Sequence, residues 1–181
     1  MQEACSGNPD KIKIGGVKMS PELVQINLFR KSSPDLFWTG LFRQMAEDRI
    51  NLTFFTQAAV NAGFLCNFCV LSSDFHRVEN LLQQEDDKNQ QVRIIAPVGT
   101  ITIFPHHHSF TLLGCVIGIL GRARIPVHAV CTSLSSVAIN ADYVLLDQAL
   151  KELRKVMTLP VNHAPFRADL DSIRPNSYPL G

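Results

Sequence analysis

The sequence predicts an α+β protein made of two similar units, each with the element order βαββαβ and an antiparallel sheet. Three observations support this prediction. Segments with an apolar residue at every second position alternate with segments whose apolar residues recur at helical spacing. The order of these segments in the first half of the chain is repeated in the second half. Of the 181 residues, 46% are hydrophobic and 18% are charged, which provides enough apolar surface for a packed core.

The first unit starts with an alternating segment at residues 23–30, which predicts a strand. Ser33 and Pro34 provide a helix N-cap and a proline suited to the first turn, so a helix is predicted to follow. This helix should end near Arg49, and a second helix should begin at Asp74. The remaining strands of the unit are predicted at residues 50–56, 64–70 and 92–96.

The second unit repeats this order after residues 97–99, whose proline and glycine indicate a boundary. A loop at residues 106–109 precedes an apolar helix at residues 110–121. A later helix carries four apolar residues at helical spacing, namely Leu146, Leu150, Leu153 and Met157. The strands of this unit are predicted at residues 100–104, 125–131 and 137–141, with a last strand near Val161.

The order βαββαβ is that of the ferredoxin-like fold, in which right-handed crossovers place both helices on one face of an antiparallel sheet. The other face and the edges of such a sheet stay available for pairing. We therefore expect the two units to pair side by side and the chain to form a homodimer. The predicted division is an N-terminal extension (1–20), a first domain (21–97), a second domain (98–165) and an irregular C-terminal tail (166–181).

The charge balance excludes some classes of partner. With 17 basic and 16 acidic residues the formal net charge is +1, so we expect neither nucleic acid nor a membrane as a partner. The first 20 residues hold no apolar stretch long enough for a signal peptide, and residues 110–120 are too few to cross a membrane. We therefore expect a cytoplasmic protein. At least four of the five cysteines lie in apolar runs and are interpreted as small core residues in a reducing compartment, namely Cys66, Cys69, Cys115 and Cys131.

Several motifs share their order and spacing with one family. They are Ile50-Asn51-Leu52 with Gln57, Cys66-Asn67-Phe68-Cys69-Val70 with Asp74-Phe75, and Thr132-Ser133. Together they resemble the tandem ACT domains that form the regulatory half of aspartate kinases, and the resemblance covers residues 15–157. It does not include an amino-acid kinase domain. The resemblance therefore implies a regulatory protein that is not an enzyme, and any enzyme that it regulates would be another polypeptide.

In that family the ligand is an amino acid held between the loop before the first helix and the following strand of a neighbouring copy. The resemblance implies a site for a small amino acid here too. The candidate ligand-binding residues are Arg30, Ser32, Ser33, Asn51, Gln57, Thr132 and Ser133. A helix N-terminus suits the ligand carboxylate, and amide side chains suit a zwitterion. The chain departs from the family pattern at Asp35-Leu36, where proline-glycine is expected, and at Pro126, where asparagine is expected.

Plainer interpretations of these residues stay open. Asn51 could cap a loop, and Gln57 could lie on a solvated strand face. Thr132 and Ser133 could serve the geometry of their strand. For the whole protein, the alternative to an amino-acid sensor is an interaction module that has lost its ligand. The two hypotheses differ in whether the predicted pocket is open or is filled by side chains.

Two other motifs are given no chemical role. Residues 106–108 are three consecutive histidines in a predicted loop, and no Cys-His spacing elsewhere completes the four ligands of a structural zinc site. An exposed loop is the favoured interpretation, with anion binding or a pH response as the alternative. Cys66 and Cys69 have CxxC spacing but fall in a strand that sends them to opposite faces. We therefore expect no metal, no cofactor and no catalytic residue.

Overall fold

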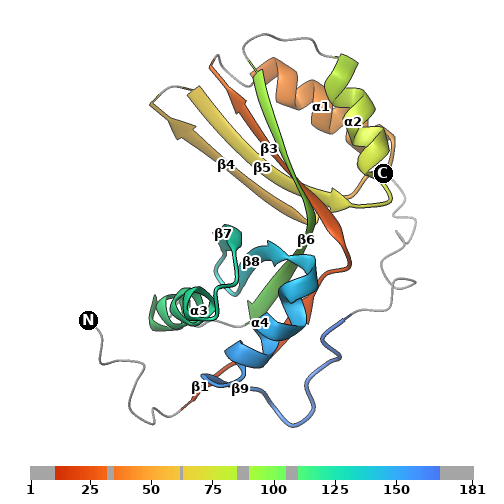
Figure 1. Cartoon of the computed structure of the whole chain (residues 1–181). Helices are drawn as coiled ribbons and strands as arrows, with labels where there is room; N and C mark the ends of the chain where they lie inside the picture. The colour runs from red at the N-terminus through yellow and green to blue at the C-terminus, as the bar shows by residue number, and fades with distance from the viewer. Residues whose placement is uncertain (1–10, 32–34, 62, 85–89, 105–109, 168–181) are drawn as a thin grey trace. The chain divides into compact units, whose positions relative to one another are not determined.

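The computed structural model describes residues 11–31, 35–61, 63–84, 90–104 and 110–167 (Figure 1). They form two compact units. The first unit contains the described residues within 22–99, together with 142–144. The second unit contains the others, which come from 11–21, 100–141 and 145–167. Among the described residues, no helix has the length and apolar character needed to span a membrane.

The first unit is a four-stranded sheet with two helices. Its elements are β3 (Leu23–Arg30), α1 (Asp35–Glu47), β4 (Phe54–Val60), β5 (Gly63–Leu71), α2 (Phe75–Gln84) and the first part of β6 (Gln90–Phe104). The strand order is β4-β5-β3-β6, and neighbouring strands are antiparallel. Both helices lie on one face of the sheet (Figure 1). This arrangement confirms the predicted ferredoxin-like fold of the first repeat.

The core of the first unit lies between the two helices and the sheet, because alternation gathers the apolar side chains of each strand on one face. The strands contribute Val24, Ile26, Leu28, Cys66, Phe68 and Val70, and the helices contribute Trp38, Leu41, Met45, Val78 and Leu82. Phe42 of α1 extends this core toward the sheet edge. Its ring makes edge-to-face contacts with Phe55 and Phe68, both at 5.5 Å between centroids.

Strand β4 begins at Phe54, so the prediction that it starts at residue 50 is wrong. The chain leaves α1 through Arg49, which has a positive φ of 56°. The amide of Ile50 then donates to the carbonyl of Met45, and its side chain is buried in the core. Ile50, which the alternating pattern placed in the strand, thus lies at the C-terminal end of α1 instead. An alternating pattern cannot distinguish a strand residue from an apolar residue at a helix end.

Strand β6 runs unbroken from Gln90 to Phe104, so the prediction of two separate strands at residues 92–96 and 100–104 is wrong. Pro97 is accommodated because the pairing of β3 with β6 shifts between Leu23 and Gln25, which leaves one extra residue on β6 at this point. A proline has no amide hydrogen to donate, and such irregular positions are where strands tolerate it. The boundary between the two compact units lies just after this position, between Gly99 and Thr100.

The second unit contains the last part of β6 and the elements after it. These elements are α3 (Phe110–Arg122), β7 (Val127–Thr132), β8 (Val137–Asp142), a 3-10 turn (Tyr143–Leu145), α4 (Leu146–Leu153) and β9 (Met157–Thr158). The start of the chain adds β1 (Ile12–Lys13) and β2 (Gly16–Met19). Helices α3 and α4 contact each other, and their buried residues are Leu112, Cys115, Val116, Ile119, Leu120, Leu146, Ala149, Leu150 and Leu153.

The fourth strand of the second sheet is β2, and the prediction of a last strand near Val161 is wrong. Residues 16–19 pair antiparallel with the end of β6, while β8 lies on the other side of β6. Val161 is 99% exposed and lies in a turn. Strand β9 pairs in parallel with β1 instead of joining this sheet. The segment expected as an N-terminal extension therefore completes the second ferredoxin-like unit.

Candidate functional site

Arg30 is the last residue of β3 and stands opposite Phe64 of β5 and Gln90 of β6. Its side chain is half-buried. Ser32 and Ser33 lie outside the described residues, as do the histidines at 106–108. The described part of this candidate site is therefore a basic residue at the edge where the chain leaves the sheet and enters α1.

Asn51 lies at the other end of α1, in the loop before β4, and is exposed. The neighbouring Thr53 donates its amide hydrogen to Cys69 of β5, whereas Arg30 pairs with Phe64 of the same strand. These two positions on β5 are five residues apart, which corresponds to about 17 Å along a strand. Within one copy, the first unit thus does not bring Arg30 and Asn51 together around one small ligand.

Gln57 is in the middle of β4, which is an edge strand of the first sheet. It shares the helix-covered face with Phe55 and stands opposite the buried Cys66. Its side chain is nevertheless exposed. Neither Gln57 nor Asn51 forms a side-chain hydrogen bond with another described residue, so both amides remain available to a ligand.

Thr132 and Ser133 lie at the end of β7 in the second unit. Thr132 is exposed and pairs with Val137. The hydroxyl of Ser133 accepts the amide hydrogens of Ser135 and Ser136, at 3.4 and 3.1 Å, and lies 2.9 Å from the Ser136 hydroxyl. This geometry supports the plainer interpretation of Ser133, which organises the turn between β7 and β8.

A row of polar side chains crosses the first sheet on the face away from the helices, and the sequence analysis missed it. Asn67 of β5 donates to the hydroxyl of Thr56 on β4 at 3.4 Å, and it stands opposite Asn27 of β3. Gln25, which is fully buried, donates to Asn27 at 2.9 Å. The strand alternation puts these residues on one face, but only the register aligns them across strands.

Cys66 and Cys69 are both buried, and they point to opposite faces because they are three residues apart on β5. Cys66 packs in the core beneath the helices. Burial raises the pKa of its thiol to about 12. In the part of the chain that the structure describes, no group of three His, Cys, Asp or Glu residues could hold a metal ion.

We expect Cys66 to resist alkylation in the folded protein, because the thiolate is the reactive species and is scarce at about pH 8 when the pKa is about 12. Cys131, which is half-buried, serves as the comparison within the same molecule. Mass spectrometry after iodoacetamide treatment should find Cys131 modified before Cys66, and both modified after unfolding in urea. Equal labelling of the two in the folded protein would contradict this expectation.

No protein-family model matches the sequence, and no curated protein matches it either. Solved structures do match the fold. The regulatory subunits of aspartate kinase from Thermus thermophilus and Thermus flavus superpose with TM-scores of 0.68 and 0.70, at 13% and 12% sequence identity. Each match covers 79% of this chain and 97% of the other. The chain has the fold of an aspartate kinase regulatory subunit.

Structures of aspartate kinases match as well, over a smaller part of their own length. The enzyme from Synechocystis matches 84% of this chain but only 29% of its own, with a TM-score of 0.66 and 16% identity. E. coli aspartokinase III in complex with lysine and aspartate matches 83% of this chain and 34% of its own, with a TM-score of 0.57 and 11% identity. Most of this chain is thus matched by regulatory subunits that have no kinase domain.

Proposed function

We propose that this chain is a non-catalytic regulatory protein of the cytoplasm that binds a small amino acid and modulates a partner enzyme. The observation that carries the proposal is the match to isolated regulatory subunits over 97% of their length. Aspartokinase III, which has the same fold in its matching third, was solved with lysine and aspartate bound. By analogy we propose that this chain binds an amino acid, without specifying which one.

The ligand site in this proposal is built from two copies of the chain. Arg30 and Asn51 lie at opposite ends of α1, so one small amino acid cannot contact both within one copy. A homodimer could set the β3 end of one first unit beside the Asn51 loop of the other. The ligand carboxylate would then lie near Arg30, and the amide of Asn51 would accept from the ammonium group. Thr132 and Ser133 take no part in this site.

The exposed amides support this site energetically. Asn51 and Gln57 form no side-chain hydrogen bonds with other described residues, so a ligand would not have to displace an internal partner. Charge-assisted hydrogen bonds of the kind that a zwitterion offers contribute about 1.5–3 kcal/mol each. Two or three of them suffice for binding in the micromolar to millimolar range.

An interaction module without a ligand is the second candidate. One observation favours it, because the edge strand β4, which carries Gln57, also exposes apolar side chains. Phe55 is 43% exposed and Val60 is 44% exposed. Apolar residues on an exposed edge suit pairing with another strand. In this case the partner chain would fill the space that the sensor keeps for an amino acid.

We expect one or a few of the common amino acids to raise the melting temperature of the wild-type protein in a thermal-shift screen, since a ligand of the native state stabilises it. Asn51→Ala should reduce this shift, with binding weakened about tenfold or more. The unliganded melting temperature should hardly change, because Asn51 is exposed and makes no internal side-chain bond.

Asn162→Ala is the matched control, because Asn162 is also exposed but lies in the second unit. It should keep the full ligand-induced shift. If no amino acid stabilises the wild type at millimolar concentrations, the sensor hypothesis fails and the interaction module replaces it. If an amino acid binds and Asn51→Ala binds it equally well, the function stands but the site lies elsewhere.

A further inference from the structure

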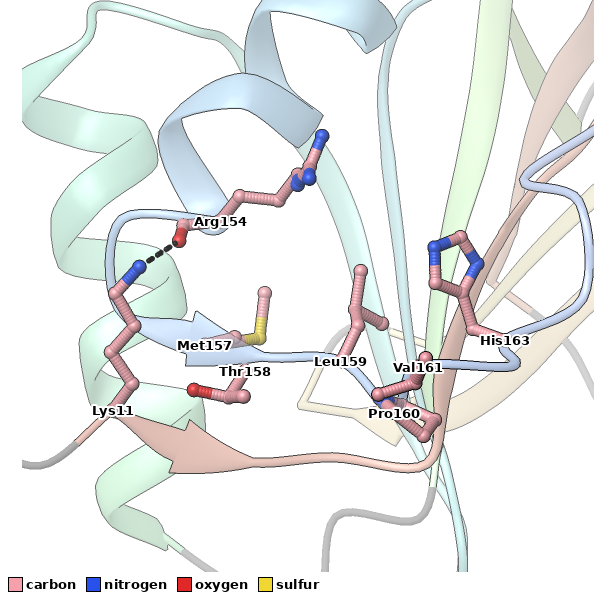
Figure 2. Close-up of a pocket in the computed structure, with 8 residues that line it drawn as sticks. All are labelled: Lys11, Arg154, Met157, Thr158, Leu159, Pro160, Val161 and His163. Carbon is pink, nitrogen blue, oxygen red and sulfur yellow. Dashed lines mark hydrogen bonds between the residues drawn. The ribbon is translucent and has the colours of Figure 1, made fainter.

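A pocket of about 350 Å³ lies in the second unit, away from the amino-acid site proposed above. Its lining residues are Lys11, Arg154, Met157, Thr158, Leu159, Pro160, Val161 and His163. They come from the chain just before β1, the end of α4, and β9 with the segment after it. Figure 2 shows Lys11 and His163 at opposite ends of the row from Met157 to Val161, with the Arg154 side chain between them. The volume is in the range of small-molecule sites.

The lining is basic and contains no carboxylate. The Lys11 ammonium donates one hydrogen bond, to the backbone carbonyl of Arg154 at 3.1 Å (Figure 2), which leaves its other donors free for a ligand. The Arg154 guanidinium forms no ion pair with another described residue, and its nearest described interaction is with the ring of Phe166, 6.0 Å from its centroid. Two permanent positive charges therefore face one pocket without a compensating negative charge among the lining residues.

The acidic groups nearest to this pocket along α4 are already paired with other cations. The Lys155 ammonium donates hydrogen bonds to both carboxylate oxygens of Glu152, each at 2.6 Å. The Arg167 guanidinium donates to both carboxylate oxygens of Asp147, at 3.0 and 3.1 Å. Because each of these carboxylates has its own basic partner, neither neutralises Lys11 or Arg154.

Phe166 contacts two of the residues that line the pocket, His163 and Arg154. The His163 ring stacks on it, with 4.6 Å between centroids and 24° between planes, and Arg154 lies against the same ring. The carbonyl of Phe166 accepts the amide hydrogen of Met19 at 2.6 Å, which fastens this segment to β2. A pocket whose basic side chains are held in place before binding loses less entropy when a ligand binds.

A purely structural role explains only part of this arrangement. A cation near the last carbonyls of α4 is favourable, and the Lys11 hydrogen bond to Arg154 meets that need. This role does not explain why the guanidinium of Arg154 and the ring of His163 are gathered over the same apolar floor. This floor includes the apolar side chains of Met157 and Leu159, which Figure 2 shows on the side where the Arg154 side chain lies.

We propose that this pocket binds a small organic dianion, either a phosphate monoester or a dicarboxylate. Its anionic oxygens would accept hydrogen bonds from Lys11 and Arg154, and its carbon atoms would lie against Met157 and Leu159. The proposal does not depend on the amino-acid site, because every lining residue belongs to the second unit.

Such a ligand would also hold the start of the chain in place. Strands β1 and β9 pair over only two residues each, which is a weak contact by itself. A dianion that contacts both Lys11 and Arg154 would join the two sides of this pair, although they are 143 residues apart in sequence. Binding would therefore protect the backbone amides of residues 12–14 from hydrogen exchange.

The test uses glycerol 3-phosphate and succinate as separate probes, each compared with sodium chloride at equal ionic strength and with glycerol as the neutral compound. Thermal shift and calorimetry should find that at least one dianion binds and that glycerol does not. Arg154→Gln and Lys11→Gln should each raise the dissociation constant about tenfold or more. Arg43→Gln, an exposed arginine of the first unit, is the matched control and should bind as the wild type does.

The two probes distinguish the ligand class, since the one that binds more tightly identifies a phosphate or a dicarboxylate. Hydrogen exchange should slow at residues 12–14 when the probe is bound, and Asn51→Ala should leave this binding unchanged. The proposal is overturned if neither dianion binds more tightly than chloride at concentrations on the order of ten millimolar. It is also overturned if Arg154→Gln and Lys11→Gln bind the probe as well as Arg43→Gln does.

Discussion

Val17→Asp is expected to destabilise the second unit strongly. Val17 is 2% exposed in β2, opposite Ile103 of β6, which is fully buried. A carboxylate at this position would lose its hydration without gaining a partner. Such substitutions are among the most destabilising, and we expect a loss of about 3 kcal/mol or more. Circular dichroism during thermal unfolding should report a fall of about 10 °C or more in the transition of this unit.

Val161→Asp is the matched control for this prediction. The sequence pattern predicts the fourth strand of this unit near Val161, where the structure has β2 with Val17 instead. Val161 is 99% exposed. Its replacement should change stability by less than about 0.5 kcal/mol. Trp38, the single tryptophan of the chain, is buried in the first unit, so its fluorescence follows that unit separately. The assignment of β2 to the sheet is wrong if Val161→Asp destabilises the protein and Val17→Asp does not.

Strand β2, which the sequence pattern did not predict, shows why some strands cannot be recognised from sequence alone. The alternation of β3 runs over eight residues, and that length made its helix-covered face predictable. Strand β2 has only four residues, Gly-Val-Lys-Met, and so short a pattern cannot be distinguished from chance. Its partner on β6 also lies more than 80 residues away along the chain. Where β2 pairs depends on which strand edge the rest of the fold leaves unpaired, and here that edge belongs to β6.

For the candidate site, the sequence suggests residue types but carries no information on how they are arranged in space. The resemblance selected Asn51 and Gln57, and both side chains are exposed without internal partners. It could not reveal that Arg30 and Asn51 lie at opposite ends of α1, because distance across a fold is not encoded in spacing along the chain. For the same reason, nothing in the sequence indicated that Lys11 lies beside Arg154.

Gly63→Ala is expected to destabilise the first unit by about 3 kcal/mol or more. Gly63 begins β5 and has a φ of +151°, a backbone conformation that residues with a side chain rarely adopt. A methyl group there would overlap the backbone carbonyl oxygen of Arg30 and would lie 2.9 Å from the Cα atom of Lys31. Both obstacles are backbone atoms, so a side-chain rotation cannot relieve them. The end of β3 would have to move away from the β4–β5 hairpin.

Gly40→Ala is the control for this second prediction, because it makes the same chemical change in the same unit. Nothing lies within 4 Å of a methyl group at Gly40, and the residue is inside α1. Alanine is the better helix former, so this variant should gain about 0.5–1 kcal/mol. Urea unfolding followed by Trp38 fluorescence should therefore move in opposite directions for the two variants. Equal midpoints would mean that the hairpin does not approach the end of β3 as closely as the structure has it.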